Sequence, residues 1–261
     1  MCIIKVMWNP INKIKTTFYN LGFFARTLKG VVYFIRHSHA SFRILIMQIL
    51  FTFVYAMGIS TLLALAIGAA VKIIGMPMLS GFSQEQLIYS LLIIIITREL
   101  GPLLTAFIVI ARSATAIATE IAGMVISHEV EAYISIGVDP IEHLAVPRFL
   151  GVTISLVLLN IYFSVFGLAG SFLVAQLFSS TPMDHYFSSL LQHLTIQDIL
   201  LSIIKSVSFG IIISIVAVIQ GFSVERASTE IPVAGLKAVS GAFGLCILVN
   251  VLLSVLFYVV L

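Results

Sequence analysis

Residues 44–71 read ILIMQILFTFVYAMGISTLLALAIGAAV, a run without a charged side chain that lies between Arg43 and Lys72. A helix rises about 1.5 Å per residue, so about 20 such residues cross a hydrocarbon layer of about 30 Å. The run is continuously apolar, whereas the strands of a membrane β-barrel alternate apolar and polar residues. This stretch therefore predicts a transmembrane helix.

Four further segments have the length and composition of membrane spans. Three of them cover residues 149–176, 199–222 and 238–261. The fourth, residues 87–111 with a small-residue extension to about 125, carries Arg98 and Glu99 near its middle. Hydrophobic residues make up 60% of the chain and charged residues 10%, against about a quarter charged in a soluble domain. We predict an all-α integral membrane protein whose five transmembrane helices lie within residues 44–261.

The basic residues gather at the N-terminal end. Residues 1–43 contain seven of the 14 Lys and Arg residues and no Asp or Glu. By the positive-inside rule this predicts a cytoplasmic N-terminus, and five spans then place the C-terminus in the periplasm. Aromatic and basic side chains intersperse within residues 16–42, a pattern typical of an amphipathic helix in the headgroup layer. A plain polar tail is the alternative. Lys72 at the far end of the first span disagrees with this orientation.

The charged motif TRELGP at residues 97–102 is the most informative feature inside a span. Ionised groups near the middle of a bilayer cost about 2.5–3.5 kcal/mol each on insertion scales, and they normally face a cavity or a partner. Pro102 removes the partner of the Arg98 carbonyl, so we predict that the helix kinks at the charges. We interpret the motif as the polar floor or gate of a substrate cavity. The alternative is an interhelical ion pair, such as Glu99 with Lys205, that only fixes packing.

Small residues follow Pro102 and then give way to a hydrophilic insertion. Small side chains at helical spacing favour close helix packing in lipid, here within the chain or against a second copy. In the insertion, residues 127–140, Ser127 can cap a short helix with Glu129 and Glu131 in its first turn, and Gly137 can end it. A permease needs such an exposed cytoplasmic helix to receive force from an ATPase. The candidate coupling residues are Glu129, Glu131, Tyr133, Gly137 and Asp139.

Catalytic and metal-binding motifs are absent from the sequence. HExxH, CxxC, GxSxG and GxxxxGK[ST] do not occur, so we expect no catalytic residue, no metal site and no cofactor on this chain. ATP and Mg²⁺, if used, would be bound by a separate ATPase chain. No nucleic-acid partner is expected.

The stretch RELGPLLTAFIVIARSATAIATEIAGMVISHEVEAYISIGVDPIEHLAVPR resembles the signature region of the MlaE (YrbE) family, the permeases of Mla-type ABC transporters of phospholipid. The matching positions are Arg98 to Pro102, Arg112, Glu120 with Met124, Glu131-Ala132, Gly137, Asp139-Pro140 and Pro147-Arg148. Ala114, His128 and Ile136 depart from the residues common in the family. Length, basic N-terminus and span count agree with the family over nearly the whole chain.

The resemblance implies an inner-membrane homodimer that moves phospholipid between the inner and outer membranes and maintains lipid asymmetry. It also implies an ATP-binding subunit, a periplasmic MCE-domain lipid-binding protein and a STAS-domain protein as partners. Arg98 would then bind a lipid phosphate, and Glu99 would hold Arg98 or a headgroup amine. The full set of candidate substrate residues is Arg98, Glu99, Leu100, Leu103, Leu104, Phe107 and Lys205.

Two other classes of protein remain open on the sequence alone. A secondary transporter or channel could use the same charges, although no internal repeat is present. A lipid-modifying enzyme would have only His128, Glu129, Glu131 and His143 as candidates, and their spacing matches no catalytic motif.

Overall fold

A computed structural model describes residues 22, 23, 26, 27, 29–31, 42–80, 86–179, 183–225 and 227–260 of the chain. All regular elements in these residues are helices. Five helical stretches are long and apolar enough to cross a membrane: Phe42–Gly75, Leu87–Ile126, Ile141–Leu177, Ile196–Phe222 and Glu230–Val259. The predicted all-α fold with five spans is thereby confirmed. Most of the predicted amphipathic segment, residues 16–42, lies outside the described residues, and its described residues 22, 23, 26, 27, 29–31 and 42 are helical.

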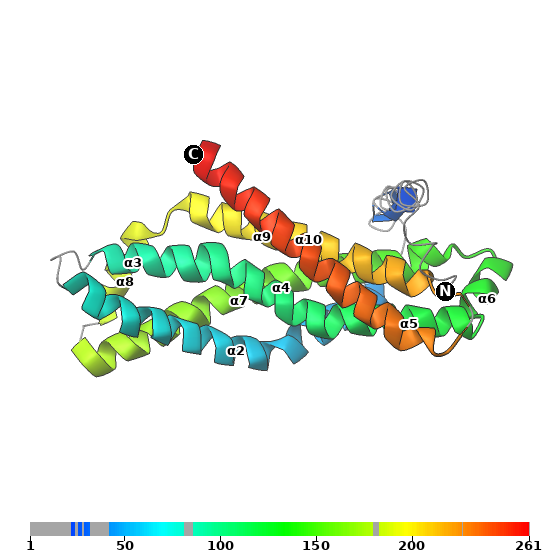
Figure 1. Ribbon diagram of the computed structural model, residues 1–261, viewed down its shortest axis with the longest axis horizontal. Helices are drawn as coiled ribbons and strands as arrows, with labels where there is room; N and C mark the ends of the chain where they lie inside the picture. The colour runs from blue at the N-terminus through cyan, green and yellow to red at the C-terminus, as the bar shows by residue number, and fades with distance from the viewer. Residues whose placement is uncertain are drawn as a thin grey trace, which may run out of the picture.

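The elements follow one another as a series of long helices with short interruptions (Figure 1). They are α2 (Phe42–Ser80), α3 (Gln86–Leu92), η1 (Ile93–Leu100), α4 (Gly101–Val109), η2 (Ile110–Ala114), α5 (Thr115–Ile126), α6 (Glu129–Ser135), η3 (Ile141–Ala145), α7 (Val146–Ser179), α8 (Met183–His193), α9 (Ile196–Phe222) and α10 (Glu230–Val260). The three η elements are π-helical. The short helices α3 and α8 lie at one end of the molecule and α6 lies at the other.

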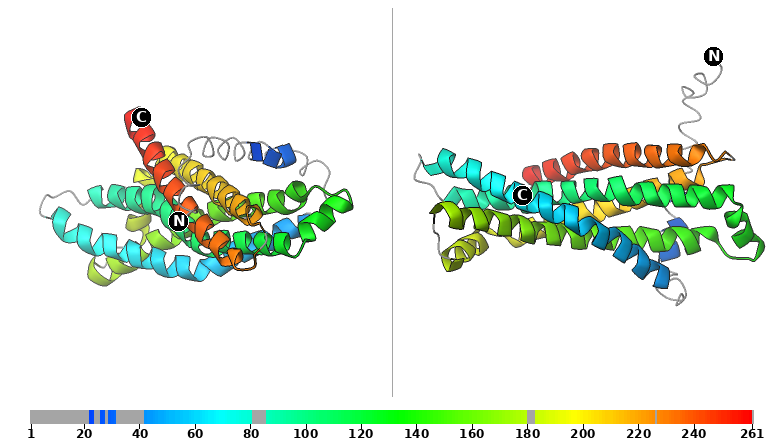
Figure 2. Two further views of the ribbon diagram at one scale, coloured as in Figure 1. Left: turned by 45° about the vertical axis from the view of Figure 1, so that its right-hand side comes forward. Right: turned by 90° about the horizontal axis from the view of Figure 1, so that it is seen from below.

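Small residues allow α2 to pack along α7, which it crosses in the view from below (Figure 2). A Cβ atom on Gly68 of α2 would overlap the backbone of Gly167, and one on Gly170 of α7 would lie 2.6 Å from the carbonyl oxygen of Leu65. The two backbones therefore touch. Close approach of this kind supplies the van der Waals contact that holds helices together in lipid.

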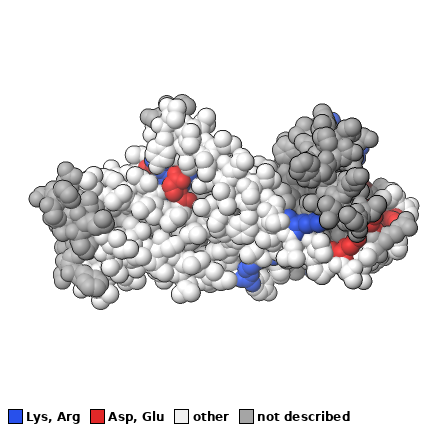
Figure 3. Space-filling view, in the orientation of Figure 1, with Lys and Arg blue, Asp and Glu red and all other residues white. Residues whose placement is uncertain are grey.

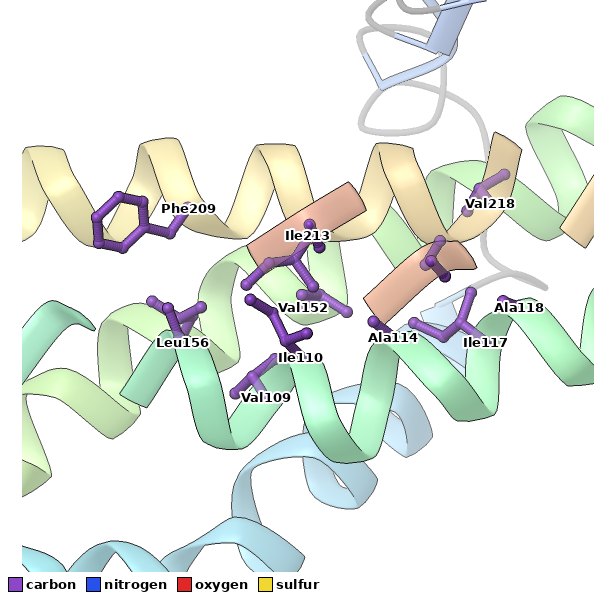
Figure 4. Close-up of a cluster of buried hydrophobic side chains, with 14 of the residues drawn as sticks. Val109, Ile110, Ala114, Ile117, Ala118, Val152, Leu156, Phe209, Ile213 and Val218 are labelled. Carbon is purple, nitrogen blue, oxygen red and sulfur yellow. The ribbon is translucent and has the colours of Figure 1, made fainter. Parts of the chain in front are cut away.

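The main apolar core lies between α4, α5, α7 and α9 and is closed by α10 (Figure 4). Val109, Ile110 and Ile117 from the second span meet Leu156 of α7 and Ile213 of α9 there. Several of the small residues after Pro102 are fully buried: Ala106, Ala114 and Ala118 in this core, and Ala122 in a neighbouring cluster with Val224 and Ala234. Their close packing is therefore already achieved within one chain.

Charged side chains are unevenly distributed over the surface. On the face shown in Figure 3 they gather toward the end that carries α6, and most of the remaining surface is uncharged. A small, mainly acidic spot beside the last turns of α10 and a small basic spot near the middle of the lower edge interrupt the uncharged region. Near the end of α10, Ser254 hydrogen-bonds to Glu99 of η1, whose side chain is 26% exposed.

Candidate functional site

The second span has an irregular backbone at its charged motif. η1 is π-helical and ends at Leu100, and Pro102 follows in the first turn of α4. Proline has no N–H, so the carbonyl of Arg98 loses its α-helical partner. The ammonium group of Lys205 takes that place, with Nζ 3.2 Å from the Arg98 carbonyl oxygen. The kink expected from the sequence stays a prediction; what the structure shows is a π-helical segment in which the Arg98 carbonyl accepts a hydrogen bond from a side chain of α9.

Lys205 is the centre of a polar cluster between three elements. Its side chain is completely buried, and Nζ also donates to Glu99 Oε2 and to Ser254 Oγ, each at 2.8 Å. Ser254 in turn donates to Glu99 Oε2 at 3.0 Å. An ammonium group has three N–H donors, and the three acceptors around Lys205 match that number. The interhelical Glu99–Lys205 pair, considered above as the alternative to a cavity, is therefore formed.

Arg98 is held by a second group of contacts to the same helices. Its Nη1 atom lies 3.2 Å from Asp198 Oδ1, and the two side chains are only 10% and 9% exposed. Its guanidinium carbon lies 4.2 Å and 4.3 Å from the ring centroids of Phe257 and Tyr258 in α10, within the range of cation–π attraction. Asp198 Oδ2 also accepts from Thr195 in the capping box that starts α9. Arg98 thus joins η1, the first turn of α9 and the end of α10.

The charges of the cluster balance. Arg98 and Lys205 are cationic, while Glu99 and Asp198 are anionic, so the four formal charges sum to zero. Pairing offsets much of the cost of placing ions in a membrane interior. Glu99, with 26% of its side chain exposed, is the most accessible of the four. In this arrangement Glu99 is open to an approaching molecule, and Arg98 is engaged with the protein.

The apolar residues predicted to accept acyl chains are half-buried but do not form one wall. Leu104 packs against the cluster that includes Leu92 and Phe163. Phe107, one turn further along α4, packs against the main core and contacts Phe243 of α10, with ring centroids 4.6 Å apart. Leu100 and Leu103 are also half-buried. The structure therefore brings Glu99 and Lys205 together, and it packs Leu104 and Phe107 against different clusters.

Four contributors to the cluster were missed by sequence reasoning: Asp198, Ser254, Phe257 and Tyr258. The Thr195-x-x-Asp198 spacing is a helix-start signal that could have placed Asp198 in the first turn of a span. Nothing local could have paired it with Arg98, which is 100 positions away in the chain. Ser254 and the two aromatic residues lie in an uncharged run that carries no distinguishing pattern.

The predicted coupling segment forms an exposed helix, α6, at one end of the molecule (Figure 1). Glu129 and Glu131 lie in its first turn and are exposed, and none of its residues is buried. Gly137 follows with a φ of 80°, the left-handed conformation that ends helices. The expected cap at Ser127 is wrong: His128 is the N-cap, with a φ of 59° and no side-chain cap bond, and Ser127 instead bonds to the side chain of Glu129.

The other two predicted coupling residues have contacts within the segment. The ring of Tyr133 lies 5.2 Å from that of His143. The Asp139 carboxylate accepts a hydrogen bond of 2.9 Å from the N–H of Ile141. Just inside the membrane-crossing stretches, buried Arg148 of α7 pairs with Glu120 of α5 at 2.8 Å. These contacts join the two arms of the hairpin that presents α6.

At the opposite end, Lys72 lies among aromatic side chains. It is buried, and its Nζ atom is 5.1 Å from the ring centroid of Tyr89 and 5.9 Å from that of Tyr186. Tyr186 of α8 is buried too, with its hydroxyl 2.5 Å from Ser171 Oγ. Burial raises the pKa of Tyr186, and the bond to Ser171 opposes that shift. The basic residue that disagreed with the orientation rule is therefore not a surface charge.

A bundle of five helices long and apolar enough to cross a membrane, with ion pairs inside it and an exposed helix at one end, defines a multi-pass membrane protein. The chain belongs to the MlaE permease family, because residues 45–256 match the family described as "Permease MlaE".

Curated relatives agree with this family. A "Probable ABC transporter permease protein" of Rickettsia prowazekii is 30% identical over 215 residues, which cover 82% of this chain and 83% of the relative. The "Intermembrane phospholipid transport system permease protein MlaE" of Haemophilus influenzae is 28% identical over 174 residues, 64% of this chain and 67% of the relative. The chloroplastic protein TRIGALACTOSYLDIACYLGLYCEROL 1 of Arabidopsis thaliana is 27% identical over 162 residues, which cover 62% of this chain and 46% of the relative. The chain is thus an ABC transporter permease of the MlaE family and a transport subunit.

Proposed function

We propose that this chain moves phospholipid between the inner and outer membranes of a bacterium and so maintains outer-membrane lipid asymmetry. The name of the Haemophilus relative supports the substrate class. The observation that carries the proposal is the ion cluster of Arg98, Glu99, Asp198 and Lys205 inside the spans, with Glu99 open at its edge. Such a cluster suits an amphipathic substrate, whose headgroup needs polar contacts within an apolar layer.

Arg98 is proposed to bind the lipid phosphate by exchanging partners. It is paired with Asp198, and its Nε atom is buried without a hydrogen-bond partner among the described residues. Two phosphate oxygens could accept from Nε and the adjacent Nη2, a bidentate geometry that guanidinium groups favour, and the phosphate would then replace Asp198 as the counter-charge. Glu99 would face a headgroup amine, while Leu100 and Leu103 would contact acyl chains with Leu104 and Phe107 behind them. Lys205 would hold Glu99 in place.

The assembly proposed around the chain has several partners. A second copy would complete the lipid cavity, and an ATP-binding subunit would bind ATP and Mg²⁺ and dock on α6. A periplasmic MCE-domain protein would exchange lipid with the permease, and a STAS-domain protein would bind the ATPase. The N-terminus would be cytoplasmic and the C-terminus periplasmic, which places α6 on the side of the ATPase.

The test is lipid capture by the assembled complex. A photocrosslinking amino acid at Leu103, in a complex copurified with its ATPase, should capture phospholipid in an ATP-dependent manner. The same group at Leu158, an exposed position of α7, serves as the control for contact with bulk lipid. Arg98→Ala should reduce transport much more than it reduces expression. Normal transport by both Arg98→Ala and Glu99→Ala would show that the cluster only fixes packing.

A further inference from the structure

The short helix α8 (Met183–His193) has apolar side chains on its surface as well as in its contact with the bundle. Tyr186 and Leu190 are buried against the rest of the molecule. Met183, Phe187 and Leu191, which we call the α8 stripe, are instead 60%, 39% and 64% exposed. Exposed apolar residues that adjoin one another mark a contact with another molecule or with a membrane.

Helical geometry puts the α8 stripe on one strip of the helix surface. Positions four apart on an α-helix differ by about 40° in direction, so the three side chains follow one another along the axis. Gln192, the neighbour of Leu191, is turned by about 100° from it. The exposed side chains of α8 outside the stripe are polar: Asp184, His185, Ser188 and Gln192. α8 therefore has a buried side, an exposed apolar side and an exposed polar side.

The helix α8 is tied closely to two membrane-crossing helices, at the end of the molecule away from α6 (Figure 1). Residues 180–182 connect it to α7 and residues 194–195 connect it to α9, and three residues reach at most about 11 Å. The spans of these two helices end at Leu177 and begin at Ile196, which are 81% and 83% exposed. α8 is therefore held at the level where both spans leave the hydrocarbon layer, and their exposed apolar surface continues to its two ends.

The charge of α8 indicates how it would contact a lipid surface. The helix contains no Lys or Arg, and Asp184 is its one acidic residue. Attraction to anionic headgroups, which requires basic residues, is therefore not available to it. An amphipathic helix at a membrane surface buries its apolar side about 5–10 Å deep, at the boundary between headgroups and acyl chains. The α8 stripe supplies such a side.

We propose that α8 inserts the α8 stripe into the membrane leaflet on the side away from α6. The helix lies along the membrane surface, with its stripe among the upper segments of the acyl chains and its polar side toward the headgroups and water. The ligand is the hydrocarbon of any bilayer-forming phospholipid, whatever the charge of its headgroup. The proposal does not depend on the substrate of the transporter.

The experiment reads the depth of position 191 in the full-length protein, reconstituted into phosphatidylcholine vesicles. The chain has one tryptophan, Trp8, which is replaced by Trp8→Phe before Leu191→Trp is introduced as the fluorescent reporter. Gln192→Trp in the same background is the matched control, because it lies on the polar side one position away. Phosphatidylcholine with bromine on the upper acyl chain should quench Leu191→Trp at least about threefold more than Gln192→Trp, because only the stripe reaches the acyl boundary. Aqueous iodide should quench the two reporters in the opposite order.

Each alternative occupant gives a different result. Equal quenching of the two reporters by iodide would place the stripe in water and overturn the proposal. Quenching of Leu191→Trp by neither agent would show that a second copy or another protein covers the stripe, which overturns the proposal as well. Replacing part of the phosphatidylcholine with phosphatidylglycerol should leave the result unchanged, and lipid quenching that appears only with the anionic lipid would contradict insertion by apolar contact.

Charge substitutions then test whether the stripe holds the helix in the membrane. Met183→Asp should reduce the lipid quenching of the Leu191→Trp reporter roughly twofold, because a carboxylate is poorly accommodated among acyl chains. Ser188→Asp, on the polar side, should leave the quenching unchanged. Size-exclusion chromatography in detergent checks the folding of each variant. Undiminished quenching in a folded Met183→Asp variant would show that the stripe does not position α8 and would refute the proposal.

Discussion

Replacing Lys205 with methionine tests the cluster most directly. The substitution keeps a long apolar chain and removes the ammonium group, which leaves Glu99 Oε2 and the Arg98 carbonyl without the bonds of 2.8 Å and 3.2 Å that they now receive. Removing one partner of a buried ion pair costs about 3–5 kcal/mol in soluble proteins, and interhelical bonds in membranes average less. Since Glu99 is partly exposed, we expect a loss of about 3 kcal/mol in the free energy of unfolding.

The assay is reversible unfolding by SDS from mixed micelles, followed by circular dichroism. Lys237→Met, which removes an exposed lysine of α10, is the control and should change stability by less than about 0.5 kcal/mol. Adding Glu99→Gln to Lys205→Met removes the unpaired carboxylate and should recover about half of the loss. The reasoning is refuted if Lys205→Met costs no more than the control, or if Glu99→Gln destabilises the double variant further.

Three other predictions concern separate features. Gly68→Ala should abolish folded protein, because its Cβ atom would overlap a carbonyl of α7, whereas Gly58→Ala, with no atom near the added carbon, should express normally. Comparable yields of the two variants by fluorescence size-exclusion chromatography would contradict the close packing. Glu131→Lys on exposed α6 should leave ATP hydrolysis in the assembled complex but reduce lipid movement at least tenfold, and normal transport would remove α6 from coupling. Asp198→Asn removes the counter-charge of Arg98 and should raise the amount of phospholipid that copurifies with the protein, measured as phosphorus per chain. An unchanged amount would argue against the exchange of Asp198 for a lipid phosphate.

Local sequence properties predicted the helices, since the spans followed from hydropathy and length. At TRELGP, where the missing N–H of Pro102 predicted a kink, the structure has a π-helical segment that ends at Leu100. The end of α6 at Gly137 was also predicted, because its φ of 80° suits glycine. The prediction of a cap at Ser127 was wrong, because the chain reverses direction between α5 and α6 and His128 takes a left-handed conformation there. A capping preference of about 1 kcal/mol is too small to decide the backbone of such a turn.

The sequence by itself determined the membrane class and the number of spans, because a bilayer constrains each 20-residue segment independently of the others. Local motifs determined the family and the exposed helix α6. The tertiary structure alone decided the partners of the charges. Arg98 meets Asp198 across 100 positions, Lys205 meets the Arg98 carbonyl across 107, and Ser254 meets Glu99 across 155. Two cations and two anions can be paired one-to-one in two ways, both of which satisfy charge balance, and only the packing of η1, α9 and α10 selects the one in which Arg98 is enclosed and Glu99 is left open.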